Sequence, residues 1–176
     1  MKKHLFFAVL VAVIFYSTSL YAGQDHLGHF YVGAGGSYAV EDFDSSADFD
    51  NSWGVNAKIG YHTHPLLDIE FDFDYLSEFE ANAVDLEILT YMIVLKGYFQ
   101  QSTEKVKVSV IAGTGIMHAD ADGDETGWCA KVGLGLDFFT FQNISLGIEG
   151  NYTFGIDDDL DEVGYSNFTI GAAYHF

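Results

Sequence analysis

Apolar and acidic residues alternate without interruption through residues 67–75, Leu-Asp-Ile-Glu-Phe-Asp-Phe-Asp-Tyr. Because successive side chains of a β-strand point to opposite faces, this pattern predicts a strand with one apolar face and one carboxylate face. The same period of two recurs along the rest of the chain, so we expect eight strands. They cover residues 29–40, 53–62, 67–75, 89–99, 106–116, 128–138, 144–154 and 165–176.

The connections between these strands alternate in length. Three are tight, at residues 62–66, 100–105 and 139–143. Four are longer, at residues 41–52, 76–88, 117–127 and 155–164. Strands of about ten residues, with short turns at one end and longer loops at the other, are typical of outer-membrane barrels. The predicted fold is therefore all-β, an eight-stranded antiparallel up-and-down transmembrane β-barrel.

Alternation alone does not tell which face meets solvent, and a soluble lipocalin-like barrel would turn its apolar face inward. Two features favour an apolar face that points outward. The other face consists largely of Gly and Ser, for example Gly33, Gly60 and Ser109, which suits a narrow interior. Aromatic residues also gather at both ends of the apolar face, as at the two interfaces of a bilayer. They are Tyr38, Trp53, Tyr75, Trp128, Tyr152 and Phe154 at one end, and Phe30, Tyr61, Phe99, Phe138, Tyr174 and Phe176 at the other.

The N-terminus has the pattern of a secretory signal peptide. Lys2 and Lys3 precede an apolar run over residues 5–16, and Ala22 ends the expected cleavage site. The apolar run is too short to span a bilayer. We therefore expect residues 1–22 to be a signal peptide and residues 23–176 to form one outer-membrane β-barrel domain.

The charge balance excludes a nucleic-acid partner. The chain has a net charge of −19, and it contains no Arg. Nucleic acids require a basic surface, which this composition does not provide. Cys129 is the single cysteine, so no intrachain disulfide is possible, and we read it as an inert interior residue. No motif in the sequence predicts a cofactor.

Charged residues at inward positions predict an ion network in the lumen. Outside the signal peptide the chain has five lysines, and four of them have inward parity, together with six carboxylates. Such a network is expected to block the lumen more than to stabilise the fold, because desolvation offsets much of the Coulomb attraction. The predicted network comprises Lys58, Lys96, Lys107, Lys131, Asp68, Glu70, Asp72, Asp74, Asp137 and Glu149.

Most of the remaining acids fall in the four long connections. These connections hold eighteen acidic residues and no Lys or Arg. A surface of this kind disfavours polyanions such as heparin and favours basic partners or divalent cations. Divalent bridges to the phosphates of lipopolysaccharide are one possibility, and a purely repulsive solvated surface is the other. The run from Asp120 to Glu125 does not have the residue spacing of a calcium loop.

At this point the chain resembles the eight-stranded outer-membrane β-barrel family, which holds OmpA-like transmembrane domains and opacity-like surface proteins. The resemblance rests on the signal peptide, the opening strand from Phe30, and the final strand up to Phe176. It implies a Gram-negative outer-membrane location with extracellular loops, periplasmic turns and a periplasmic N-terminus. It also implies that the barrel-assembly machinery reads the last strand, through Phe168, Ile170, Ala172, Tyr174 and Phe176.

Three histidines share inward parity at the end with the short turns. His29, His62 and His175 lie on strands that become neighbours when the barrel closes. Three imidazoles could bind Zn²⁺ or a similar metal, or they could change charge between pH 5 and 8. The simpler interpretation is that they are polar filler at a wet opening.

The sequence gives little support for catalysis. The resemblance brings to mind barrel enzymes that deacylate lipid with a His-x-Ser pair, and this pair does not occur here. We therefore predict a non-enzymatic outer-membrane surface protein, such as a surface antigen, with a structural or adhesive role. The alternative is a small porin-like ion channel, and the less expected ones are a lipid-modifying barrel enzyme and a lipocalin-like binder. The ligand of the loops, in a host or on another surface, is not predictable from the sequence.

Overall fold

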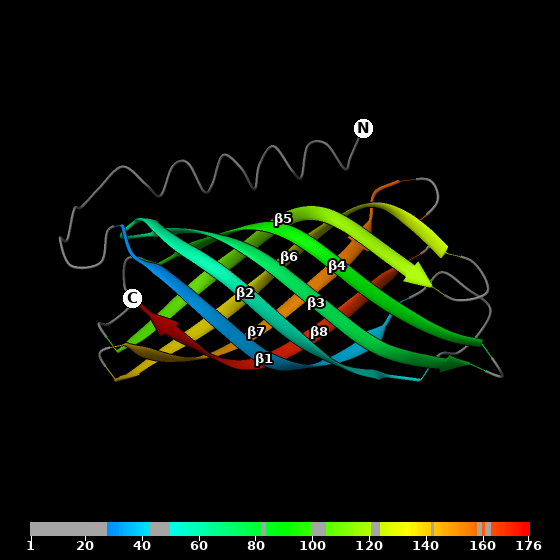
Figure 1. Ribbon diagram of the computed structural model, residues 1–176, viewed down its shortest axis with the longest axis horizontal. Coiled ribbons are helices and arrows are strands. Elements are labelled where there is room, and N and C mark those ends of the chain that lie inside the picture. The colour runs from blue at the N-terminus through cyan, green and yellow to red at the C-terminus, as the bar shows by residue number, and fades with distance from the viewer. Residues whose placement is uncertain are drawn as a thin grey trace.

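The computed structural model is a closed barrel of eight strands, strongly tilted to the barrel axis (Figure 1). It describes residues 28–42, 50–81, 84–99, 105–120, 124–141, 143–157, 160 and 163–176. The predicted signal peptide, residues 1–22, lies outside the described residues. The strands are β1 (Phe30–Glu41), β2 (Ser52–His64), β3 (Leu67–Ala81), β4 (Val84–Tyr98), β5 (Val106–Asp120), β6 (Asp124–Phe141), β7 (Ile144–Gly155) and β8 (Gly164–His175).

Each strand pairs with its neighbours in sequence, and β1 also pairs with β8 to close the barrel. All eight pairings are antiparallel. The start of β1 and the end of β8 lie at the same end, which we call the turn end (Figure 1). The opposite end carries the four connections that were predicted as long loops, and we call it the loop end. The predicted up-and-down antiparallel barrel is confirmed.

The outer surface of the barrel is apolar. Trp53, Leu134 and Ile170 expose 69%, 62% and 68% of their surface. Trp128 at the loop end, and Phe30, Phe99 and Phe176 at the turn end, are also exposed. A soluble barrel would bury such residues, whereas a bilayer provides the apolar environment that they need. This distribution rejects the lipocalin-like alternative.

The sequence alone leaves open which face of β4 points into the lumen, because Met92 and Val94 are as apolar as their neighbours. Lys96 decides it, since a lysine is expected inside the barrel and not in contact with lipid. In the structure Met92, Val94 and Lys96 are buried, whereas Tyr91 and Ile93 are exposed. The assignment from the single lysine is correct, and Met92 and Val94 fill the lumen.

Two of the loops differ from the prediction. The connections expected at 76–88 and 117–127 are much shorter, because β3 and β4 continue to Ala81 and from Val84. Likewise β5 continues to Asp120 and β6 begins at Asp124. A register shift between Leu76 and Phe79 interrupts the ladder and marks where we ended the strand. Beyond it, Phe79, Leu86 and Ile88 are buried, so the extended hairpin has its own apolar packing.

Buried apolar side chains fill the lumen at the loop end. They come from six strands and from one residue of the last loop, and we call them the loop-end cluster. Its members are Ala39, Leu76, Phe79, Leu86, Ile88, Met117, Ala119, Cys129, Leu160 and Tyr165. Leu160 packs directly against Gly155, where a Cβ would collide with the Leu160 backbone. Cys129 is a buried free thiol in this cluster, as expected of an interior residue.

No helix among the described residues is long and apolar enough to cross a membrane.

Candidate functional site

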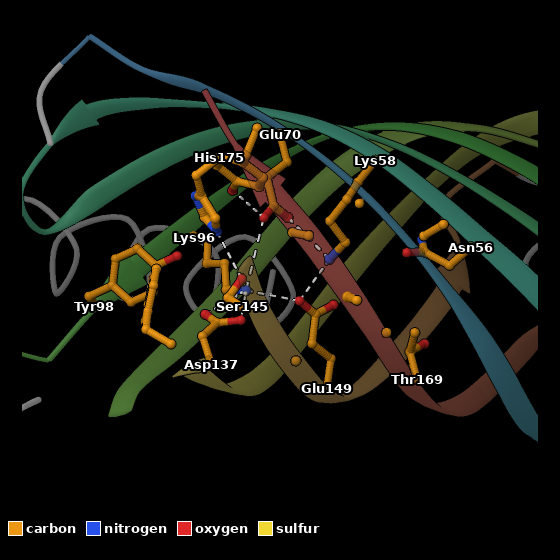
Figure 2. Close-up of a pocket in the computed structure, with 18 residues that line it drawn as sticks. Asn56, Lys58, Glu70, Lys96, Tyr98, Asp137, Ser145, Glu149, Thr169 and His175 are labelled. Atoms are coloured by element: carbon orange, nitrogen blue, oxygen red, sulfur yellow. Dashed lines mark hydrogen bonds and ion pairs between the residues drawn. The ribbon is translucent and has the colours of Figure 1, made fainter. Parts of the chain in front are cut away.

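Five charged side chains meet in the middle of the lumen, and we call them the central network: Lys58, Lys96, Glu70, Asp137 and Glu149. The Lys58 ammonium lies 2.7 Å from Glu149 Oε1 and 3.6 Å from Glu70 Oε2. Lys96 Nζ lies 2.9 Å from Glu149 Oε1 and 2.9 Å from Asp137 Oδ2. Figure 2 shows both lysines pointing toward Glu149 across the lumen. These contacts join β2, β3, β4, β6 and β7 through side chains alone.

A second ion cluster lies between the central network and the loop end. Lys131 on β6 places its ammonium 2.6 Å from Asp74 Oδ2 and 3.4 Å from Asp72 Oδ2. Asp74 also accepts hydrogen bonds from Asn56 Nδ2 at 2.7 Å and Thr90 Oγ1 at 3.3 Å. All five side chains are buried. Here one cation faces two carboxylates, so the cluster carries one negative charge when every group is ionised.

Lys107 departs from the predicted network. It has inward parity, but none of the salt bridges between described residues includes it. Its ammonium lies 5.1 Å from the centroid of the Tyr98 ring and 4.9 Å from that of Phe139. Lys107 is near the start of β5, so it reaches the turn end, where its ammonium lies over two aromatic rings. A lysine above an aromatic face is attracted by the ring quadrupole.

Asp68 belongs to the turn end as well, and it is fully buried. Its Oδ2 accepts hydrogen bonds from the hydroxyls of Tyr98 at 2.8 Å and Tyr31 at 3.3 Å. Its Oδ1 lies 2.7 Å from Nδ1 of His62. The carboxylate therefore pairs with polar groups from β1, β2 and β4 instead of with a lysine.

Side chains from all eight strands close the lumen at the turn end. His62 Nε2 lies 3.2 Å from His175 Nδ1, and His175 Nε2 lies 2.8 Å from Ser145 Oγ. The Phe139 ring packs 5.3 Å from the His175 ring. We call the whole set the mouth layer: Tyr31, His62, Asp68, Tyr98, Lys107, Phe139, Ser145 and His175. It is one residue thick and continuous around the barrel.

The histidines do not lie as the metal prediction supposed. His62 and His175 stack, with ring centroids 5.4 Å apart, and both nitrogens of each ring have hydrogen-bond partners. His29 is exposed at the rim, where its Nδ1 lies 2.7 Å from the carbonyl oxygen of Phe176. Among the described residues no three His, Cys, Asp or Glu side chains form a group that could hold a metal. We therefore do not carry the three-histidine metal site forward.

Sequence reasoning missed three polar members of the mouth layer. Tyr31, Tyr98 and Ser145 are buried and inward, and each donates or shares a hydrogen bond with the charged groups. Their inward parity was visible in the sequence, because each alternates with outward apolar residues. The alternation does not predict the position of these residues along the barrel axis, because that position depends on the strand register.

One small cavity lies between the mouth layer and the central network. Its volume is about 40 Å³, and its lining includes Lys58, Lys96, Glu149, Ser145 and His175 (Figure 2). A water molecule needs roughly 10–15 Å³ measured in this way, so the cavity has room for a few waters and no more. The lumen is thus occupied by side chains at the mouth layer, the central network, the Lys131 cluster and the loop-end cluster.

The residues of the predicted barrel-assembly signal all face outward. Phe168, Ile170, Tyr174 and Phe176 are exposed on the outer surface of β8, and Ala172 lies among them on the same face. Tyr174 and Phe176 contact each other edge to face. The structure places them together as a single apolar stripe on the last strand.

Part of the predicted acidic surface is described, at the loop-end rim. Glu87, Asp120 and Glu125 are exposed, whereas Asp42 Oδ2 accepts the Tyr152 hydroxyl and Asp157 Oδ2 accepts the Trp128 amide. The remaining loop acids that lie outside the described residues are Asp44, Asp48, Asp122, Asp158, Asp159, Asp161 and Glu162. Asp42 and Asp157 thus anchor the ends of two loops to the barrel.

Known structures share this barrel. Neisserial surface protein A superposes with a TM-score of 0.71 at 20% identity, covering 84% of this chain and 97% of that one. Ail, the attachment invasion locus protein of Yersinia pestis, gives 0.56 at 21% identity, covering 85% and 99%. OprG of Pseudomonas aeruginosa gives 0.59 at 13% identity, covering 87% and 98%. At these identities the likeness establishes the fold.

No curated protein matches the chain in sequence. The family model described as outer membrane protein beta-barrel domain matches residues 8–176, which is nearly the whole chain. Together with the closed antiparallel barrel and its apolar outer surface, this match identifies the chain as a member of the outer-membrane β-barrel protein family.

Proposed function

We propose that this protein is a surface barrel that presents acidic loops to binding partners and conducts no ions. The observation that carries the proposal is the filled lumen. The mouth layer, the central network, the Lys131 cluster and the loop-end cluster occupy the interior from one end to the other. An eight-stranded barrel has an interior just wide enough for side chains to fill, and here only about 40 Å³ is left in the cavity. On this proposal the described side chains block the lumen, the barrel serves as a scaffold, and the binding activity resides in the loops.

The loops carry the chemistry that defines the partner. The loops and the strand ends beside them hold eighteen acids and no Lys or Arg, and the described rim residues Glu87, Asp120 and Glu125 are exposed. Such a surface attracts basic protein segments and divalent cations and repels polyanions. Divalent cations at the rim would also link the loops to lipopolysaccharide phosphates.

One structural neighbour has been crystallised with an anionic ligand. Ail has been determined in complex with sucrose octasulfate, a heparin analogue, and that structure superposes on this chain with a TM-score of 0.55 at 22% identity. A sulfated ligand requires a basic surface. On the present chain the loops have the opposite charge, so we expect a surface role without affinity for sulfated polyanions.

A binding assay on reconstituted protein tests the loop proposal. The protein is placed in vesicles of neutral lipid, and binding of a lysine-rich peptide and of sucrose octasulfate is measured at about 0.05 and 0.5 M salt. We expect binding of the peptide only, with at least tenfold weaker binding at the higher salt, because screening weakens exposed charge pairs. Binding of sucrose octasulfate, or peptide binding that ignores salt, would contradict the proposal.

A matched pair of variants locates the binding surface. Neutralising the five acids of the last loop (Asp157, Asp158, Asp159, Asp161 and Glu162) to Asn or Gln should weaken peptide binding severalfold. Neutralising the six buried carboxylates of the lumen is not a usable control, because it would disturb folding. The control is instead Glu104→Gln with Asp25→Asn, two acids outside the long loops, and it should leave binding unchanged.

Placement in the membrane is the second part of the proposal. We place the loop end outside the cell and the turn end and N-terminus in the periplasm. In intact cells an external protease should cleave only in the loops. Assembly should depend on the outward stripe of the last strand, so Phe176→Ala with Tyr174→Ala should reduce the amount of folded barrel in the outer membrane. Normal levels of folded double variant would count against a role of these residues in assembly.

A further inference from the structure

A continuous hydrogen-bonded chain runs through the mouth layer, from Asp68 through His62 and His175 to Ser145. The distances are 2.7, 3.2 and 2.8 Å in that order. The four residues belong to β3, β2, β8 and β7, so the chain crosses over β1, where the Tyr31 ring packs 4.9 Å from His62 and 5.1 Å from His175. These contacts tie five consecutive strands together across the seam where β1 and β8 close the barrel.

The ionised state of Asp68 sets the direction of every bond in the chain. The Tyr98 hydroxyl donates to Oδ2 of Asp68, whereas the Tyr31 hydroxyl lies 2.5 Å from Glu70 Oε1 and 3.3 Å from Asp68 Oδ2. As a carboxylate, Asp68 can only accept. His62 Nδ1 must then donate to it, which leaves Nε2 of a neutral His62 as an acceptor. His175 Nδ1 must donate to that nitrogen, and its own Nε2 accepts from the Ser145 hydroxyl. Both imidazoles are therefore held in the tautomer with hydrogen on Nδ1.

Protonation affects this chain in two distinct steps. When one proton is added, His62 can carry hydrogen on both nitrogens and donate from Nε2 to His175 Nδ1. His175 then carries its hydrogen on Nε2 and donates to Ser145, so all three bonds persist with two of them reversed. When a second proton is added, an N–H of each ring faces the other across 3.2 Å, and the two stacked rings carry like charge. The bond between them cannot survive that state.

Other charged groups face the two rings from the remaining strands. Carboxylates favour the doubly protonated state, and lysines oppose it. The groups are Glu70 on β3, Lys96 and Tyr98 on β4, Lys107 on β5, Asp137 on β6, Glu149 on β7 and, at the rim, His29 and His64. Lys96 is already neutralised by Asp137 and Glu149, so Lys107 is the cation of the mouth layer itself.

We infer that the Asp68–His62–His175–Ser145 chain is a proton-operated latch that keeps the turn end of the lumen closed and releases when both imidazoles are protonated. The latch takes up one proton without losing a hydrogen bond. The second proton breaks the bond between His62 on β2 and His175 on β8. An imidazole takes up a proton on acidification, so acid is the condition that releases the latch.

The chain resembles a nucleophilic site in having a hydroxyl next to an imidazole that a carboxylate orients, yet its setting differs. Ser145 is buried, and the cavity that it borders has a volume of only about 40 Å³. The strand backbone groups around it are engaged in the barrel ladder, with Ser145 paired to Phe139 and Ala173. There is no room for an acyl substrate, so the hydroxyl ends the latch and is not an attacking group.

The tautomers are the first test, because they require no variant. Histidine labelled with ¹⁵N distinguishes ring nitrogens that carry hydrogen from those that do not. At pH 8 we expect hydrogen on Nδ1 of both His62 and His175, the reverse of the more common tautomer. On acidification the signals of both rings should change together, in two steps. Hydrogen on Nε2 of either ring at pH 8, or independent single transitions, would overturn the latch.

Stability gives the second test, with matched variants at the same end of the barrel. The wild-type heat-unfolding midpoint in detergent should fall between pH 8 and pH 5. His62→Gln and His175→Gln each leave one imidazole, so the doubly protonated pair cannot form, and the fall of their midpoints should be smaller by at least about 3 °C. His29→Gln, which leaves the chain intact, and Ser145→Ala, which keeps the bond between the imidazoles, should behave like the wild type. A heat-dependent gel shift confirms that each variant is folded before it is compared.

Two results would overturn the inference. If His62→Gln and His175→Gln fall as far as the wild type, the groups that titrate lie elsewhere. If a fluorophosphonate probe labels Ser145 in the wild type but not in His175→Gln, the chain activates a nucleophile instead of closing the mouth.

Discussion

The ammonium of Lys131 lies 2.6 Å from Oδ2 of Asp74, and each side chain is only 2% exposed. The two residues come from β6 and β3, which are not neighbours in the barrel, so the contact crosses the lumen. A fully buried ion pair has lost its hydration and depends on its partner and on further hydrogen bonds. Asn56 and Thr90 supply such bonds to Asp74.

Lys131→Met should destabilise the barrel strongly. It removes the cation and leaves Asp72 and Asp74 buried side by side, which typically costs about 3–5 kcal/mol when one partner of a buried pair is lost. Denaturant unfolding in detergent or lipid measures the loss. Lys105→Met, at an exposed position before β5, is the control and should cost less than about 1 kcal/mol. Adding Asp74→Asn to Lys131→Met should recover part of the stability, and a further loss would contradict the pairing.

Gly60→Ala should damage the mouth layer. A Cβ at this position would lie 2.0 Å from a ring carbon of Tyr31, so the ring must move away from Glu70 and Asp68. Forcing an extra methyl group into a packed interior costs about 1–3 kcal/mol. Gly36→Ala is the matched control, because nothing lies within 4 Å of a Cβ there. The two unfolding free energies should differ clearly, and equal values would show that Tyr31 is not fixed over Gly60.

Opening the central network should not by itself produce a conducting barrel. Replacing Lys96 and Glu149 together by Ala removes the ion pair whose atoms approach to 2.9 Å beside the cavity, and it keeps the net charge of the lumen unchanged. We expect no discrete conductance steps in planar bilayers for this double variant, because the mouth layer, the Lys131 cluster and the loop-end cluster still occupy the lumen. Leu134→Ala with Leu136→Ala, a double variant on the outer face of β6, should be equally silent. Steady conductance steps from the lumen variant alone would show that the other three layers leave a passage.

A charge on the outer face should be costly near the middle of the bilayer. Ile170 is 68% exposed on β8, between the aromatic groups at the two ends of the barrel. Ile170→Lys should destabilise the folded barrel in lipid by about 2–4 kcal/mol. Thr126→Lys, exposed near the loop-end start of β6, should have little effect. If both lysines are tolerated equally, the apolar face is not in contact with lipid.

The alternation of residues predicted the barrel well, because each strand has one face toward lipid and one toward a crowded interior. A single lysine was enough to orient β4, since Lys96 cannot face lipid while Tyr91 and Ile93 can. The length of the β3–β4 hairpin was underestimated because Phe79 and Leu86 pack beyond the register shift that ends the regular pattern. The β5–β6 hairpin was underestimated because β5 continues through Met117 and Ala119, which are buried in the same cluster.

The lumen contacts were less accessible from sequence. Inward parity identified the lysines and carboxylates, but height along the barrel depends on strand stagger, which alternation does not contain. Lys107 was therefore grouped with carboxylates when it lies over the rings of Tyr98 and Phe139. For the same reason His29 was grouped with His62 and His175, although it lies at the exposed rim and the other two stack below it.

The most direct measurement of the filled lumen is a planar-bilayer recording of the purified wild-type protein at neutral pH. The account predicts no steady channels, because side chains occupy the interior from the mouth layer to the loop-end cluster. Stable, ion-selective conductance steps from folded protein would contradict it and would make the protein a small channel.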